Sequence, residues 1–135
     1  ESTIPGLFSA NSSGQGLAAA FALRVKPNGE QQYEPVAVYD DAQKVFVARP
    51  IDLGSDNVYL ILYGTGLRYR SSLSAVSAKI GGLASQVVYA GGQGSYAGLD
   101  QLNVLLGRNL AGRGDVEVEV EVEGKLANKV KVHIR

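Results

Sequence analysis

Short apolar runs separated by glycine-containing turns are the main pattern of this sequence. The runs are rich in Val, Ile, Leu and Tyr and recur roughly every ten residues, which is typical of β-strands. A helix is the alternative at Leu17–Leu23, because Ala18, Ala19 and Ala20 favour one. We favour a strand there, since seven to nine short strands predict an all-β, immunoglobulin-like antiparallel β-sandwich. The predicted strands are Leu17–Val25, Tyr33–Tyr39, Lys44–Ala48, Asn57–Tyr63, Ser74–Ile80, Ser85–Ala90, Gln101–Leu106, Asp115–Glu123 and Asn128–Ile134.

The last two predicted strands alternate charged and apolar residues with a period of two. The first has acids at odd positions and valines between them, and the second has Lys, His and Arg at odd positions. Each strand therefore has one charged and one apolar face. Matching the charged faces predicts a three-residue loop, with Glu121 opposite Lys129, or a five-residue loop, with Glu121 opposite Lys131. It excludes a two-residue turn at Gly124–Lys125.

The length of 135 residues predicts one domain over residues 1–135. Residues 1–16 read as an arm with a hinge: Ile4, Leu7 and Phe8 are apolar, and a Ser/Gly-rich stretch at Ser12–Gly16 follows. Such an arm can add as a strand to its own sheet or to an exposed edge of a neighbour. We expect one of these two arrangements.

The composition excludes several classes of function. Lys plus Arg and Asp plus Glu both number 13, so no basic excess favours nucleic acid or an anionic membrane. The absence of cysteine excludes disulfides and thiolate chemistry. No apolar run approaches the length of a membrane span. Because Met is also absent, we expect the first residue to follow a cleavage.

The sequence offers little material for catalysis or metal binding. With one histidine, His133, and no cysteine, the usual zinc and copper sites and histidine-based triads cannot be assembled. Asp40-Asp41 and Asp56 carry the oxygen ligands that calcium prefers, but without a regular ligand spacing. Arg113-Gly114-Asp115 spells an integrin-binding tripeptide, although a turn before a strand needs glycine anyway. We expect no enzyme activity, no metal and no cofactor.

Tyrosine is the most frequent aromatic residue, with seven copies against three Phe and no Trp. Tyr63, Tyr69, Tyr89 and Tyr96 lie near glycine-rich segments, the longest of which is Gly91–Gly98. Aromatic rings there can stack on sugars or on a partner protein, and the alternative is that they are half-buried sheet residues. Tyr96 is the candidate contact in this loop.

Several segments together resemble a C-terminal domain, similar to immunoglobulin-like TIG domains, of large secreted proteins of soil bacteria. The resemblance covers most of the chain and implies the fold and an extracellular or cell-surface location, but no activity, since the function of that family is unassigned. The matching segments are Ile4–Ala10, Gly14–Gly16, Leu62–Arg68, Ile80–Leu83, Val88–Gly91, Gly98–Val104, Leu110–Gly114 and Asn128–Val130.

These observations predict a non-catalytic structural or interaction module. The first expectation is a bacterial surface fibre in which copies of the chain associate by strand addition through Ile4, Leu7 and Phe8. The alternative is a carbohydrate-binding or adhesion module of a larger secreted protein, with polysaccharide at Tyr96. Neither nucleic acid nor membrane insertion is expected.

Overall fold

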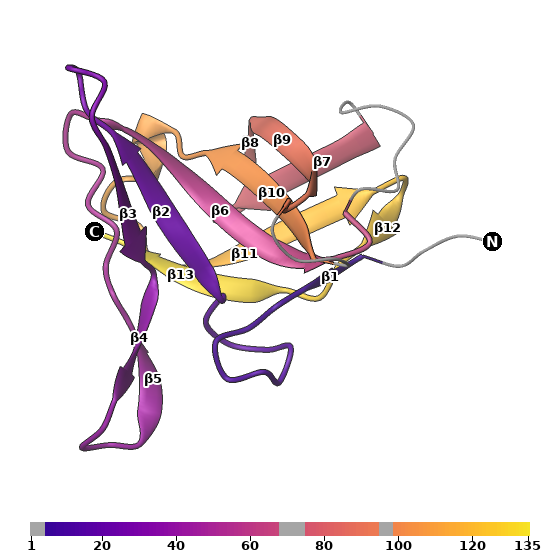
Figure 1. Ribbon diagram of the computed structural model, residues 1–135, viewed down its shortest axis with the longest axis horizontal. Coiled ribbons are helices and arrows are strands. Elements are labelled where there is room, and N and C mark those ends of the chain that lie inside the picture. Colours follow the sequence, from indigo (N-terminus) through magenta and orange to yellow (C-terminus); the bar gives the residue numbers. More distant parts are fainter. Residues whose placement is uncertain (1–4, 68–74, 95–98) are drawn as a thin grey trace.

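The computed structural model describes residues 5–67, 75–94 and 99–135, which form two antiparallel sheets packed face to face (Figure 1). The larger sheet has the order β3-β2-β6-β10-β9, and β1 pairs with β6 beyond the end of β2. Its strands are β1 (Gly6–Leu7), β2 (Ala20–Val25), β3 (Gln31–Pro35), β6 (Asn57–Thr65), β9 (Val87–Gly92) and β10 (Asp100–Leu105).

The smaller sheet has the order β12-β11-β7-β8, and β13 also pairs with β11. Its strands are β7 (Val76–Ile80), β8 (Leu83–Ser85), β11 (Gly114–Val122), β12 (Lys125–Leu126) and β13 (Val130–Ile134). A short 3₁₀ helix, η2 (Arg108–Leu110), precedes β11. The all-β sandwich class is thus confirmed, whereas the finer immunoglobulin-like topology stays a prediction.

The core lies between the sheets and follows from the period-two pattern. Alternate residues of β11 are buried valines, and the acids between them are exposed or partly exposed. Side chains from both sheets join these valines in one contiguous cluster. The fully buried side chains include Leu60, Leu62, Ile80, Leu102 and Ile134.

All nine predicted strands have counterparts among the described residues, and a strand, not a helix, lies within Leu17–Val25. The strand predicted at Tyr33–Tyr39 is two strands, because the chain leaves the large sheet at the buried Val36. Ser85 likewise ends β8, and the chain then crosses to β9 in the other sheet. These divisions and the two-residue strands β1 and β12 give thirteen strands in the described part of the chain instead of seven to nine.

A separate hairpin of β4 (Ala37–Asp40) and β5 (Val45–Ala48) stands away from both sheets (Figure 1). Asp40 shapes its turn by accepting hydrogen bonds from the N–H groups of Ala42 and Gln43. The rings of Tyr39 and Phe46 meet edge to face, 5.2 Å apart, and both are exposed. This hairpin contributes no residue to the core cluster.

The pairing of β11 with β13 confirms the predicted charge matching but not the predicted loops. Asp115 lies opposite His133, so charged residues share a face. The chain turns through two residues, Glu123 and Gly124, whose φ values of 52° and 81° suit a tight hairpin turn. Lys125 therefore pairs with Val122, and the register shifts by one residue between β12 and β13. Both predicted loop lengths were wrong because this shift, not the loop, restores the charge-matched register.

Candidate interaction surfaces

The N-terminal arm (residues 5–9) lies as a strand on its own sandwich. β1 pairs antiparallel with β6, with Leu7 opposite Gly64. The Phe8 N–H donates to the carbonyl of Tyr63 at 2.9 Å, and the Phe8 carbonyl accepts from the N–H of Ala19 at 3.0 Å. The arm is therefore hydrogen-bonded along both edges, between β6 and the segment that leads into β2. We call the surface that receives it the arm groove: residues 63–65, Ala19 and Asn128.

Gly64 makes room for the arm. A Cβ atom on this residue would overlap the carbonyl oxygen of Gly6 and would lie 3.0 Å from its carbonyl carbon and 3.2 Å from the Cα of Leu7. These atoms are backbone, so they cannot move aside as a flexible side chain would. Glycine is needed here for the close approach of a second chain segment.

Asn128 holds the backbone of Leu7 with its side-chain amide. Its Oδ1 accepts from the Leu7 N–H at 2.7 Å, and its Nδ2 donates to the Leu7 carbonyl at 2.9 Å. The same Nδ2 donates to the carbonyl of Gly14 at 2.7 Å. One carboxamide thus does for Leu7 what a neighbouring strand would do. Asn128 recognises main chain and is indifferent to the side chain that Leu7 carries.

The side chains of the arm alternate between the core and the surface. Leu7 is 3% exposed and belongs to the core cluster, whereas Phe8 is 43% exposed. Ser9 is buried again, and its hydroxyl accepts from the N–H of Gly14 at 2.8 Å. Leu7 and Phe8 therefore do not form one apolar surface, and Ile4, the third predicted contact residue, lies outside the described residues.

The predicted hinge at Ser12–Gly16 is a compact turn with its own hydrogen bonds. Asn11 Oδ1 accepts from the hydroxyls of Ser9 and Ser13 and from the Ser13 N–H. Three residues have positive φ: Ser12 at 64°, Gly14 at 81° and Gly16 at 83°. For the non-glycine Ser12 this conformation costs about 1–2 kcal/mol. Docking the arm on its own chain therefore requires a strained turn.

Two hollows flank the arm. One of about 690 Å³ lies against Leu7, Phe8 and the turn that follows, and one of about 530 Å³ separates Ala10 and Leu17 from Phe46 of the projecting hairpin. The arm is thus open to solvent on the side away from the core.

The outer face of the larger sheet is aromatic. Its members are the residues that alternate away from the core on β2, β3, β6, β9 and β10 and pair across neighbouring strands. Phe21 contacts Tyr33 on one side and Tyr63 on the other, each edge to face with ring centroids 6.4 Å apart. We call this set the aromatic face: Phe21, Leu23, Tyr33, Pro35, Tyr59, Ile61, Tyr63, Tyr89, Gln101, Asn103 and Leu105.

Packing on the aromatic face is close enough to raise the pKa of a tyrosine side chain. Burial raises the pKa of Tyr63 above its usual value, and the neighbouring Tyr33 raises it further. Beside Tyr63 in the next strand, Gln101 Nε2 donates to Asn103 Oδ1 at 2.9 Å. The face therefore combines fixed aromatic rings with a fixed pair of neutral amides.

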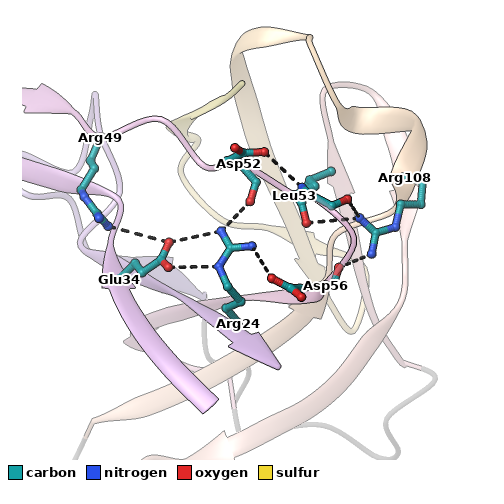
Figure 2. A network of polar contacts seen from close by, with 8 residues as sticks. Arg24, Glu34, Arg49, Asp52, Leu53, Asp56 and Arg108 are labelled. Atoms are coloured by element: carbon teal, nitrogen blue, oxygen red, sulfur yellow. Dashed lines mark hydrogen bonds and ion pairs between the residues drawn. The ribbon is translucent and has the colours of Figure 1, made fainter. Parts of the chain in front are cut away.

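A polar network closes one end of the sandwich (Figure 2). The Arg24 guanidinium donates to Glu34 at 3.0 Å, to Asp56 at 3.1 Å and to the carbonyl of Asp52. The hydrogen bond that Arg24 donates to Glu34 is the main reason why the pKa of Arg24 is raised. Arg108 donates to the carbonyls of Leu53, Gly54 and Asp56. The two arginines hold the 52–56 loop in place, so we assign them a structural role.

The other candidate residues are engaged in local structure. His133 Nδ1 lies 2.7 Å from Asp115 Oδ1 on the charged face of the smaller sheet. Asp115 is also the last residue of the integrin-like tripeptide, whose Arg113 donates to the carbonyl of Asn109. Asp40 caps its own turn and Asp56 pairs with Arg24, so these acids do not converge. Tyr69 and Tyr96 lie outside the described residues.

The described residues contain no group of three or more His, Cys, Asp or Glu placed to hold a metal ion. None of their helices has the length and apolar character needed to cross a membrane.

Comparison with known proteins gives no relative from which a role could be transferred. No protein-family model matches the chain, and no curated protein or solved structure matches it either. The resemblance to the soil-bacterial domain, and the surface location that it implies, stay predictions.

Proposed function

We propose that this chain is a non-catalytic structural module of a bacterial cell surface whose copies associate by exchanging their N-terminal arms. In the proposed assembly, residues 5–9 of one copy lie in the arm groove of the next. The groove and the arm are at different places on each copy, so repeated exchange builds an open fibre unless it closes into a ring.

The observation that supports this proposal is the way the groove recognises the arm. Asn128 and β6 bind its main chain, and Gly64 leaves room for that main chain. Leu7 enters the core cluster as an apolar side chain, and Pro5 is also buried. An identical arm from a second copy would make all of these contacts, as in other cases of strand addition.

The turn at Ser12–Gly16, which connects the arm to the sandwich, decides which copy supplies the arm. Docking on the same chain requires the tight turn with Ser12 in the left-handed region. An arm that extends to a neighbour relieves this strain while keeping the contacts in the groove. The own arm has the higher effective concentration, so exchange should prevail only at high protein concentration or after co-folding.

A disulfide experiment tests the exchange, since the chain has no cysteine of its own. One variant carries Gly6→Cys and the other Thr65→Cys, at positions that face each other in the β1–β6 pair. A Cβ on Gly6 would lie 3.5 Å from Thr65 Oγ1, which is close enough for a disulfide. The two variants are refolded together from urea at high concentration and oxidised. Exchange is expected to give a covalent dimer that contains one copy of each.

Two controls make the result decisive. The double variant Gly6→Cys/Thr65→Cys, oxidised when dilute, should give a cross-linked monomer, which shows that the pair has suitable geometry. Ser77→Cys, on the outer face of β7, measures random collision when it is mixed with Gly6→Cys. If the Gly6→Cys and Thr65→Cys mixture gives no more dimer than this control, the arm stays on its own chain and the proposal fails.

A further inference from the structure

We infer that the aromatic face is a second binding site, which uses the side chain of Tyr63 where the arm groove uses its main chain, and that its ligand is a neutral, hydroxyl-rich polymer such as an uncharged polysaccharide. Its rings and amides project from the outer surface of the larger sheet, whereas the arm groove binds main chain at the end of β6. The inference does not depend on arm exchange.

The absence of charged side chains distinguishes the aromatic face. The chain has 26 charged side chains other than histidine, counted as 13 basic and 13 acidic, yet the eleven residues of the aromatic face include none. An acidic or basic polymer would find no opposite charge there, and its own charges would lose water without compensation. A neutral ligand has no charged groups whose hydration would be lost, so the face selects against charged partners.

A pair of side-chain amides lies beside the rings. The bond between Gln101 Nε2 and Asn103 Oδ1 fixes both side chains, and each amide has further donor or acceptor capacity. An apolar surface of a second protein would bury that capacity unsatisfied, which is unfavourable. Hydroxyl groups both donate and accept hydrogen bonds, so a sugar can pair with the amide N–H groups and with the amide oxygens. The amides therefore favour a polyol over a second copy of this chain.

Two of the three neighbouring rings, those of Tyr33 and Phe21, are exposed to solvent. Tyr33 is 61% exposed and Phe21 39%, and with Tyr63 they cross three neighbouring strands. Fixed rings offer apolar contact at little entropic cost, and the tyrosine hydroxyls add polar contacts at their edges. An open apolar hollow of about 320 Å³ is lined by Phe21 and Tyr63 and also by Phe46 of the projecting hairpin. A chain of sugar rings can run over the tyrosines with one substituent in this hollow.

Affinity electrophoresis of the full chain tests the inference, with laminarin, mannan and dextran as neutral probes and alginate as the acidic one. At least one neutral polysaccharide should retard the parent chain, and added salt should leave the retardation unchanged. Tyr33→Ala and Asn103→Ala should each weaken binding by about tenfold. Glu117→Gln, on the outer face of the other sheet, is the matched control and should bind as the parent does.

Each other outcome overturns the inference. No retardation by any neutral probe removes the site, and so does a Tyr33→Ala variant that binds unchanged. Stronger retardation by alginate would contradict the charge argument. If Tyr33→Ala instead abolishes a concentration-dependent dimer of the parent, the face is a protein contact. Repeating the titration with the oxidised Gly6→Cys/Thr65→Cys monomer separates this site from the arm: retained binding supports the inference, and lost binding overturns it.

Discussion

The two outer faces of the sandwich differ in almost every property. On the smaller sheet, alternate residues of β11 are acids, opposed by His133 and Lys131 on one side and by Lys79 on the other. On the larger sheet the outward-facing positions carry aromatic and aliphatic residues and two amides, and none of them is charged. One face is built to remain in water, and the other has the composition of an interface centre, rich in aromatics and poor in charge.

The faces also differ in how their side chains contribute to stability. The ion pairs that Lys129 makes on the charged face are long and partly exposed: its Nζ lies 3.8 Å from Glu117 and 3.5 Å from Glu119. Such pairs are worth about 0–1 kcal/mol, so their main effect is to set register and to discourage edge pairing. The aromatic face instead buries Ile61 to 1% exposure outside the main core cluster. It is a second, smaller apolar cluster on the outside of the protein.

The largest expected effect comes from removing that buried side chain. Ile61→Ala should lower the free energy of unfolding by about 2–4 kcal/mol, because it leaves a cavity beneath the aromatic rings. Glu119→Ala, at an outward position of the other sheet, should change it by less than about 0.5 kcal/mol. Urea denaturation measures both. Equal effects would show that the aromatic face is not packed, and the contrast between the faces would be lost.

The sequence predicts the charged face of the smaller sheet because alternation is a local property, whereas the aromatic face of the larger sheet was not predicted. Valine and acid alternate along one strand, and each side chain keeps its side of the sheet whatever its partner. The connection from β11 through β12 to β13 was harder to predict. Its register depends on positive φ at Glu123 and on a one-residue shift before β13, which alternation alone does not specify.

The arm groove could not be predicted because its contacts are distant in sequence. Gly64 lies within a Gly-Thr-Gly stretch that indicates a turn, but its reason is the backbone of Gly6. Asn128 was assigned to the start of a strand, whereas its amide holds Leu7, which is 121 positions away. Leu7 and Phe8 were predicted as contact residues from their apolar character, which does not reveal that only Leu7 enters the core.

An intermediate effect separates the two faces by their response to salt. Lys129→Gln should lower the free energy of unfolding by no more than about 1 kcal/mol in dilute buffer and by almost nothing in molar salt. Phe21→Leu removes the edge contacts with Tyr33 and Tyr63 and should cost about 0.5–1.5 kcal/mol at both salt concentrations. Parallel urea titrations at low and high salt measure this. If the effect of Phe21→Leu depended on salt, the stability contributed by the aromatic rings could not come from uncharged contacts alone.

The smallest effect concerns the pH dependence of Tyr63. Burial, and secondly Tyr33, raise its pKa, so the folded protein holds the phenolic proton more tightly than the unfolded chain does. The stability from the neutral phenol is therefore fully present below the unfolded pKa, near 10, and is lost as the pH rises through the higher folded value. The free energy of unfolding of the parent should fall more steeply between pH 9 and 11 than that of Tyr63→Phe. Curves of equal slope would mean that the phenol is as well hydrated as in the unfolded chain. Tyrosinate absorbance checks the cause, since Tyr33→Phe should let Tyr63 ionise at a lower pH by removing a neighbouring negative charge.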